Sequence, residues 1–388
     1  MTRQLGKIAQ SRVVRICALP LLVIIAVLPN YSLLKRYNSG ILVPPPTDPI
    51  TVADHAPVET TPRQQQQQRQ QYPLDGPCID PDVHWRIVVA GNYGYREDFL
   101  NWYIHCVEVG MCPATPEQRD QHAPHSTNSN DGCPPMRYAN VVLYAEDRAM
   151  YGKYLPSKLI DVKKAWDVGS KFNDIRMGFG RFGYPDGNRF RHMMSHRPSI
   201  LINELGNVTG AAMTGELDPD VIANEIGSFN VNSSRLLFID LDTIMLKDPR
   251  PHMRGDYDFW AADAKSNTSG PYNAGLIVMR PTPASISCIR RWRSYLEGRP
   301  RANYNQLAFN HVVRKMGDKI RHKLLDDALF PVGAMFKVIG EENVNEHTLN
   351  KDVVVLHNNH CDRNCSKPER AKKMGLWREK PSINMYLS

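Results

Sequence analysis

The sequence predicts an α/β fold in which helices flank a mostly parallel sheet. The apolar run at 85–90 is typical of a buried strand, the amphipathic stretch 96–110 indicates a helix, and the apolar run at 139–144 is typical of a second strand. This β-α-β order favours parallel pairing of the two strands, with the helix packed on the sheet. In such sheets, ligands bind beyond the carboxyl ends of the strands. We therefore expect functional residues in the segments that follow these strands.

Later segments add strands and helices to the same layered fold. Thr282 is a suitable N-cap for a helix that stops before Gly298, and Asn303 has the same role for a helix that ends at Gly317. Further strands are expected at 236–239, 257–264, 272–280 and 352–356, and a further helix is expected at 196–206. These elements predict one catalytic-sized domain after the N-terminal region.

The N-terminal region differs in composition from the rest of the chain. Residues 16–34 carry no charge and are long enough to span a bilayer, and the basic leading residues 1–15 favour a cytosolic tail. Residues 35–82 are rich in Pro and Gln and predict a disordered stem. We expect a single-pass type II Golgi membrane protein with residues 83–388 in the lumen; a cleaved signal peptide is the alternative. Sequons that fit lumenal exposure occur at Asn207, Asn232, Asn267 and Asn364.

Charge and cysteine content narrow the function classes. The 48 basic and 40 acidic residues give a net charge of +8, but the basic residues are spread along the chain without a nucleic-acid-binding motif, so nucleic acid is not an expected partner. No Cys-x-x-Cys pair occurs, which argues against a cysteine metal cluster. The candidate disulfides are Cys112–Cys133 and Cys361–Cys365. Cys106 and Cys288 lie on apolar helix faces and are expected to be core thiols.

Two carboxylates, Asp240 and Asp242, follow the most apolar strand-like run of the chain. An unpaired carboxylate beside a buried strand is costly, so this pair needs a cation unless it is solvated or caps a helix. Alternate residues of a strand point the same way, which lets both carboxylates face one site. Carboxylate oxygens suit Mg²⁺ or Mn²⁺, and a histidine ligand would favour Mn²⁺. His357 ends another apolar strand and is the candidate third ligand.

Five segments occur in an order that resembles a known enzyme family. They are RIVVAGNYGYREDFLNWYIHCVEVG, RLLFIDLDTIMLKDP, YNAGLIVMRPT, NQLAFN and VVVLHNNHCDRNCSKPERAKKMGLW. Together they resemble the nucleotide-diphospho-sugar transferase domain of glycosyltransferase family 77, which is similar to the glycogenin-like families. The resemblance covers about Val83 to Trp377. It implies the Rossmann-like GT-A fold, a UDP-sugar donor, and Mn²⁺ or another divalent cation as cofactor.

The resemblance also implies roles for individual residues. Asp240, Asp242 and His357 match the family's metal ligands, and Asp240 also matches a donor-binding position. The other donor-binding positions are Ala90, Gly91, Asn92, Tyr93, Glu146, Asp147, Asn273, Gly275, Lys367 and Arg370. The positions matched to catalysis near the anomeric carbon are Gln306, Asn305 and Asp263. Lys367 and Arg370 are expected to lack an anionic partner until a diphosphate binds.

Some positions depart from the family pattern or stay open. Asn305 stands where the family has Asp, and His360 stands where it has Trp. Helix capping is the alternative role for Asn305 and Gln306. Three residues ahead of the carboxylate pair can reach phosphates or lie on a solvated surface: Arg191, His196 and Arg197.

These observations predict a metal-dependent retaining glycosyltransferase, a hexosyl- or pentosyltransferase of the secretory pathway. It would move a sugar from a UDP-sugar to a glycan or glycoprotein acceptor, attached to the membrane through its N-terminal anchor. A metal and basic side chains would stabilise the charge on the leaving diphosphate, so no strong nucleophile is required. One alternative is a catalytically silent relative that acts as a binding or scaffold protein, which Asn305 favours. The other is a different metal-dependent nucleotide-phosphate enzyme, which would need more clustered acids or histidines.

Overall fold

The computed structural model describes residues 82–120, 136–168, 187–210, 217–265, 270–297, 305–360, 366–379 and 381–387. The predicted anchor and stem, Cys133, Cys361, Cys365, and the sequons at Asn267 and Asn364 lie outside these ranges, as does the side chain of Arg191. Within the described ranges, no helix is both long enough and apolar enough to cross a bilayer.

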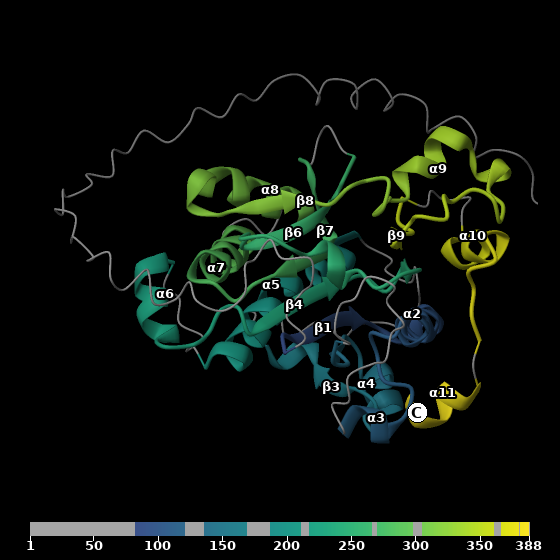
Figure 1. The fold of residues 1–388 in the computed structure, drawn as a ribbon, viewed down its shortest axis with the longest axis horizontal. Coiled ribbons are helices and arrows are strands. Elements are labelled where there is room, and N and C mark those ends of the chain that lie inside the picture. The colour runs from purple at the N-terminus through teal and green to yellow at the C-terminus, as the bar shows by residue number, and fades with distance from the viewer. Residues whose placement is uncertain are drawn as a thin grey trace, which may run out of the picture. The chain divides into compact units, whose positions relative to one another are not determined.

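A seven-stranded sheet runs through the described part of the chain, in the order β3-β2-β1-β4-β7-β6-β8 (Figure 1). The strands are β1 (His84–Gly91), β2 (Asn140–Ala145), β3 (Asp161–Lys164), β4 (Ser234–Ile239), β6 (Phe259–Asp263), β7 (Tyr272–Met279) and β8 (His322–Leu324). Strand β1 is parallel to β2 and β4, β2 is parallel to β3, and β6 is parallel to β8. Only β7 is antiparallel to its neighbours among these strands. The predicted mostly parallel α/β sheet is confirmed.

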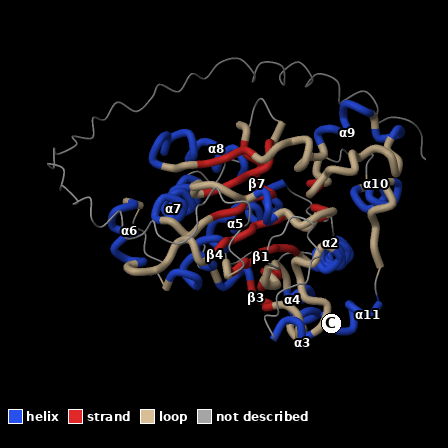
Figure 2. Tube along the Cα trace, viewed as in Figure 1, coloured by secondary structure: helices blue, strands red, loops and turns tan. Residues whose placement is uncertain are grey.

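Helices cover both faces of the sheet, as Figure 2 shows. They are α2 (Arg96–Glu108), α3 (Pro116–Asp120), α4 (Arg148–Tyr154), α5 (Gly187–Thr209), α6 (Pro219–Ile226), α7 (Pro283–Glu297), α8 (Asn305–Met316), α9 (Ala334–Ile339), α10 (Lys367–Lys373) and α11 (Pro381–Leu387). Side chains of β1 alternate between the faces: Ile87 and Val89 pack with Phe99 of α2, whereas Val88 packs in the cluster with Ile200 of α5. Burial on both faces explains the nearly continuous apolar strand sequences.

A two-stranded ribbon of β5 (Thr243–Met245) and β9 (Val355–His357) forms a separate sheet. Ile244 and Leu356 of this ribbon pack with Phe336 of α9 and Ala371 of α10. The strand expected at 352–356 is therefore found slightly later, and it pairs with β5 instead of joining the large sheet. Its register pairs Thr243 with His357, which brings His357 to the turn after β4.

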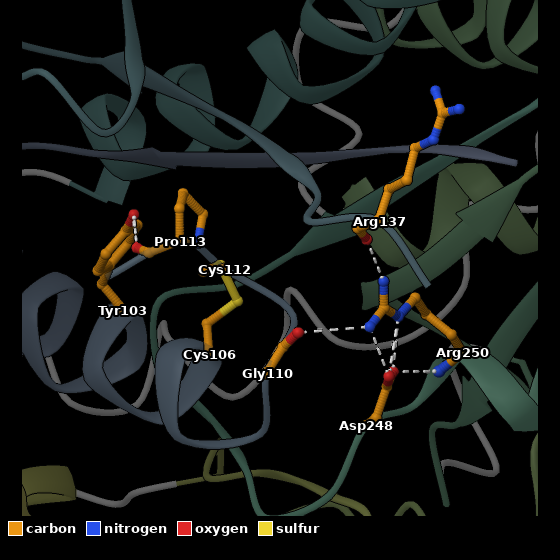
Figure 3. The surroundings of a disulfide bond; sticks show 8 residues. All are labelled: Tyr103, Cys106, Gly110, Cys112, Pro113, Arg137, Asp248 and Arg250. Carbon is orange, nitrogen blue, oxygen red and sulfur yellow. Dashed lines mark hydrogen bonds and ion pairs between the residues drawn. A yellow bond between two sulfur atoms is a disulfide. The ribbon is translucent and has the colours of Figure 1, made fainter. Parts of the chain in front are cut away.

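A disulfide joins Cys106, near the end of α2, to Cys112, which follows the helix (Figure 3). Gly110, with a φ of 74°, turns the chain back, and the two cysteine Cα atoms lie 5.2 Å apart. The expectations of a Cys112–Cys133 bridge and of a Cys106 thiol are wrong, because this turn brings Cys112 onto Cys106. Cys288 is a buried free thiol, as predicted.

Candidate active site

The carboxyl ends of β1, β2 and β4 meet at one edge of the sheet because the three strands are parallel. The register pairs Gly91 with Ala145 on one side of β1, and Val88 with Phe238 on the other. The segments that follow these strands therefore come together, as the β-α-β pattern predicted. A cavity of about 460 Å³ lies at this edge.

Most of the predicted site residues line the cavity. Those that line it are Ala90, Gly91, Glu146, Asp240, Asp242, Asn273, Gly275, Asn305, Gln306, His357 and Lys367. The predicted residues that do not line it are Asn92, Tyr93, Asp147, Asp263 and Arg370. The lining also includes Arg197, one of the residues expected to reach phosphates or lie on the surface, and His360, which departs from the family pattern. Residues to which the sequence assigned no role complete it: Tyr95, Leu241, Ala274 and Asn359.

Asp240, Asp242 and His357 form a group that can hold a metal ion, with one ligand atom of each within 4.8 Å of the others. His357 Nε2 lies 3.2 Å from Asp242 Oδ1 and 3.6 Å from Asp240 Oδ2. This nitrogen is buried and has no hydrogen-bond partner among the described residues. A buried orphan nitrogen that faces two carboxylate oxygens is a donor set that fits a hard divalent cation.

The other oxygen of each carboxylate is neutralised by a cation of the chain itself. Arg197 Nη2 lies 2.5 Å from Asp240 Oδ1, and Lys367 Nζ donates to Asp242 Oδ2 at 2.6 Å. Each carboxylate thus has an outer oxygen that is held by a basic side chain and an inner oxygen that faces His357. The expectation that Lys367 lacks an anionic partner is wrong. These ion pairs offset the cost of placing two acids directly after a buried strand.

The ion pair between Asp242 and Lys367 shifts the pKa of both groups. Burial alone would raise the pKa of Asp242, but Lys367 and His357 hold this pKa well below its usual range. Burial alone would lower the pKa of Lys367, but Asp242 raises it. Both side chains are therefore charged at neutral pH.

The space around the metal-binding group requires glycine at position 275. Asp240 N donates to Gly275 O at 2.8 Å, which fixes β7 beside the turn after β4. A Cβ atom at Gly275 would collide with Asp240 Oδ2 and His357 Cε1. A side chain there would therefore fill the space that a cation needs.

Glu146, which follows β2, lines the cavity in a different environment. It is 8% exposed, and its Oε2 has no hydrogen-bond partner among the described residues. Burial raises the pKa of Glu146 to about 8; Arg197 lowers it in part, and Asp147 and Asp240 raise it further. The carboxyl is mostly protonated at neutral pH and can donate a hydrogen bond to a ligand.

Three predicted donor-binding residues shape the turn after β1 instead of lining the cavity. Asp147 caps α4 by accepting from Met150 N at 2.7 Å, and it also accepts from Tyr93 N at 3.0 Å. Asn92 accepts from Gly94 N at 3.0 Å. These contacts tie the turn after β1 to the start of α4.

Asn273 fixes the backbone of β7 itself, and Gln306 connects β7 to the start of α8. Asn273 Oδ1 accepts from Gly275 N at 2.7 Å, and Gln306 Oε1 accepts from Ala274 N at 3.4 Å. Both side chains also line the cavity. They therefore hold the β7 backbone in place at the point where it approaches the metal-binding group.

Arg197 joins several parts of the cavity. Besides its ion pair with Asp240, it donates to Ala274 O at 3.3 Å. With its amide oxygen turned toward the guanidinium, Asn305 accepts from Arg197 Nε and Nη1 at 3.2 Å. The solvated-surface alternative for Arg197 is wrong, since its side chain is only 12% exposed. A single arginine within a long helix carries no spacing signal that identifies it from the sequence.

Asp263 and Arg370 point to other partners. Asp263 Oδ2 lies 3.3 Å from Lys265 Nζ. Arg370 is 2% exposed and forms an ion pair with Glu341. The expectation that Arg370 lacks an anionic partner is wrong, because the residue is buried under the loop after β9.

Sequence comparisons find relatives of part of the chain. Residues 225–371 match the nucleotide-diphospho-sugar transferase family. The UDP-D-xylose:L-fucose alpha-1,3-D-xylosyltransferase 3 of Arabidopsis thaliana is 26% identical over 199 residues, which are 42% of this chain and 51% of that protein. The UDP-D-xylose:L-fucose alpha-1,3-D-xylosyltransferase MGP4 of the same plant is 24% identical over 166 residues, 37% of this chain and 44% of that protein. The chain thus spans about half the length of these curated relatives.

Among solved structures, the glycosyltransferase GlyE of Streptococcus pneumoniae TIGR4 aligns with 77% of this chain and 62% of its own. The TM-score is 0.40 and the sequence identity is 15%. The resemblance predicted from the five sequence segments is confirmed as a similarity over residues 225–371, which match the nucleotide-diphospho-sugar transferase family.

Proposed function

We propose that this protein is a metal-dependent retaining glycosyltransferase that moves a sugar from a UDP-sugar to a glycan or glycoprotein acceptor. The observation that carries the proposal is the group of Asp240, Asp242 and His357 inside the cavity of a nucleotide-diphospho-sugar transferase domain. Their inner atoms leave coordination positions that diphosphate oxygens can complete. Mn²⁺ is the proposed ion, because a histidine ligand favours it over Mg²⁺.

The charges of the cavity suit a UDP-sugar with a neutral sugar. Arg197 and Lys367 balance Asp240 and Asp242. A bound divalent cation would then cancel the negative charge of the donor's diphosphate. Glu146 adds no charge while it is protonated, as its raised pKa favours. A neutral sugar leaves the filled site near neutrality, whereas a uronic acid would leave an unbalanced buried carboxylate.

The chain's own residues supply the rest of the chemistry. When bound, the cation would act as a Lewis acid toward the diphosphate. Lys367 Nζ, 2.6 Å from Asp242, is placed to share its charge with a phosphate oxygen as the leaving group departs. The carboxyl groups that line the cavity are either paired with a basic side chain, as Asp240 and Asp242 are, or largely protonated, as Glu146 is. Neither state suits a nucleophile, which supports a reaction in which the acceptor attacks on the face from which the diphosphate leaves.

The names of two relatives suggest which donor sugar to test first. The two Arabidopsis proteins are named for UDP-D-xylose as donor and L-fucose as acceptor. We therefore propose UDP-xylose as the first donor to test, with a fucose-containing glycan as the first acceptor. Hexose donors remain within the proposal and are part of the donor screen.

The proposed location is the Golgi membrane, with residues 16–34 as a type II anchor and the catalytic domain in the lumen. The Cys106–Cys112 disulfide supports an oxidising compartment. The sequon residue Asn207 is exposed near the end of α5. Glycosidase treatment of the protein from a eukaryotic host should increase its gel mobility; protease cleavage of this domain in sealed microsomes would contradict the lumenal orientation.

A donor screen tests the catalytic proposal. The purified protein should release UDP from at least one neutral UDP-sugar in the presence of Mn²⁺, and EDTA should stop the release. UDP-xylose, UDP-galactose, UDP-glucose and UDP-arabinose form the panel, with UDP-glucuronate as the charged comparison. The proposal fails if the protein neither releases UDP from any of these donors nor binds Mn²⁺ together with UDP.

A further inference from the structure

The loop that follows β9 carries two cavity residues on a short and tightly held backbone. His357 belongs to the metal-binding group, and Asn359 and His360 line the same cavity. His360 has a φ of 53°, a left-handed conformation that costs a non-glycine residue energy unless neighbouring contacts impose it. Something in the fold must therefore hold residues 357–360 in this shape.

Arg370, on α10, makes contacts that fit this task. Its Nη1 donates to Asn358 Oδ1 at 2.8 Å and to Asn359 O at 2.9 Å. Its Nη2 donates to His360 O at 3.4 Å. One guanidinium thus bonds three successive residues of the loop. Arg370 is 2% exposed, so these bonds are shielded from water.

The guanidinium is itself fixed from the other side. Its Nε donates to Glu341 Oε2 at 3.0 Å, and its Nη2 pairs with Glu341 Oε1. The guanidinium carbon lies 4.3 Å from the centre of the Phe336 ring. Each of the five N–H groups of Arg370 can thus be matched to an acceptor in Glu341 or the loop, and a lysine could not reproduce this planar fork.

The held loop is connected directly to the metal-binding acids. Asn358 N donates to Asp242 O at 2.9 Å, and Asn358 Nδ2 donates to Lys367 O at 2.9 Å. Gly333 N donates to His357 O and to Asn359 Oδ1, each at 2.8 Å. A Cβ at Gly333 would collide with the Asn359 carbonyl. The loop is therefore clamped between Gly333 and Arg370.

We propose that Arg370, held by Glu341, is a positioning residue that sets His357 and His360 at the cavity without touching the substrate. This inference rests on the proposed metal-dependent function. It replaces the role of phosphate ligand that the sequence suggested for Arg370, because a buried guanidinium with its donors engaged cannot turn to a diphosphate without breaking the loop contacts.

The test is the Mn²⁺ affinity of the full chain in the presence of UDP, measured from free Mn²⁺ by electron paramagnetic resonance. Arg370→Lys keeps the charge but loses the fork, and should weaken Mn²⁺ binding about 10-fold; Arg370→Met should weaken it up to about 100-fold, the range seen when partners of metal ligands are removed. For the Arg370 variants, the donor KM and kcat should depend on the Mn²⁺ concentration of the assay. Excess Mn²⁺ should restore much of the activity of Arg370→Lys.

Arg250 provides the matched control. It is also fully buried, pairs with Asp248, and donates to the carbonyl oxygens of Gly110 and Arg137, at 3.5 Å and 2.6 Å (Figure 3). None of these residues lines the cavity. Arg250→Lys should lower Tm to a similar extent as Arg370→Lys but leave the Mn²⁺ affinity unchanged.

The outcomes separate the two proposals. A wild-type protein that does not bind Mn²⁺ with UDP would overturn the proposed function itself. Wild-type binding with equal Mn²⁺ affinity in Arg370→Lys would overturn the positioning role, as would an equal loss in Arg250→Lys. If Arg370→Met does not fold, Glu341→Gln gives a second measurement, since Glu341 is 40% exposed and its loss should weaken Mn²⁺ binding in the same direction by a smaller factor.

Discussion

Carboxyl groups that line the same cavity differ in how their charge is compensated. Asp240 and Asp242 each form an ion pair with a basic side chain from another element, Arg197 or Lys367. Glu146 Oε2 has no hydrogen-bond partner among the described residues, and the pKa of Glu146 rises to about 8. Direct pairing with Lys367 keeps Asp242 ionised, whereas Arg197 only partly offsets the effect of burial on Glu146. One cavity thus combines a paired, charged carboxylate with a largely neutral carboxyl group.

The largest expected effect is the loss of transfer in Asp242→Asn. The substitution removes one inner oxygen charge and leaves Lys367 without its closest anion, so activity should fall on the order of 10³-fold. Tm should also fall, because a half-buried ammonium loses its partner. Steady-state kinetics and thermal melts measure both changes, with the exposed Asp318→Asn as control. Transfer at wild-type rates would show that the group of Asp240, Asp242 and His357 is not the reaction centre.

Lys367→Ala separates cation binding from leaving-group stabilisation. The ammonium bonds the outer oxygen of Asp242 and repels a cation at the inner oxygen, so its removal should leave Mn²⁺ affinity unchanged or tighter. The kcat should nevertheless fall about 10²-fold, because a positive charge near the departing diphosphate is lost. Parallel Mn²⁺ titrations and kinetics on the same preparation measure the two effects. Weaker Mn²⁺ binding with unchanged kcat would reverse the role we give to Lys367.

Gly275→Ala tests whether the space between the acids and His357 is needed. The new Cβ would push against Asp240 and His357, and should weaken Mn²⁺ binding about 10-fold while costing roughly 1–3 kcal/mol of stability. Gly152→Ala in α4 is the control, since a Cβ there meets nothing within 4 Å. That change should be neutral or slightly stabilising. Calorimetry measures Mn²⁺ binding in the presence of UDP for both variants. Equal Mn²⁺ affinities in Gly275→Ala and Gly152→Ala would contradict this reasoning.

Glu146→Gln tests the neutral carboxyl group, and the effect on stability should depend on pH. The pKa of Glu146 is raised from 4.5 in the unfolded chain to about 8 in the folded protein, mainly by burial. The folded state therefore binds the proton more tightly, and wild type should lose stability relative to Glu146→Gln as pH rises from about 4.5 to about 8. The difference should level off above that range. Urea unfolding of both proteins in EDTA between pH 5 and 9 measures it; curves that stay parallel would show that Glu146 is ionised when buried.

The sequence predicted the parts of the site that depend on strand ends. Asp240 and Asp242 were found because a carboxylate pair after an apolar run is unusual, and the parallel order of β1, β2 and β4 placed Glu146 at the same edge. His357 was found for the same reason, although β9 turned out to pair with β5. These residues can be identified from the local sequence pattern alone, without knowledge of tertiary contacts.

The contacts of other residues cannot be predicted from a local sequence pattern. Arg197 reaches Asp240 only because α5 packs against β4 and β7, a contact that the pattern of one helix does not specify. Arg370 was assigned to phosphate because the sequence cannot distinguish a basic residue that faces a ligand from one buried beneath a loop. Cys106 and Cys112 were misassigned because the reversal at Gly110 depends on one backbone angle. Long-range packing and single turns account for each of these errors.

The Cys106–Cys112 disulfide has a consequence for how the protein is produced. The bridge spans a sequence separation of 6, and the chain-entropy relation gives roughly 2 kcal/mol of stabilisation for so short a loop. It closes the far end of α2, the helix whose first residue follows the cavity-lining Tyr95. Expression in a reducing bacterial cytosol would leave this end open, and the product should melt at a lower temperature and respond little to added dithiothreitol. Secreted or oxidatively refolded material should melt higher and lose that advantage on reduction, which makes it the preparation to choose for measuring donor turnover.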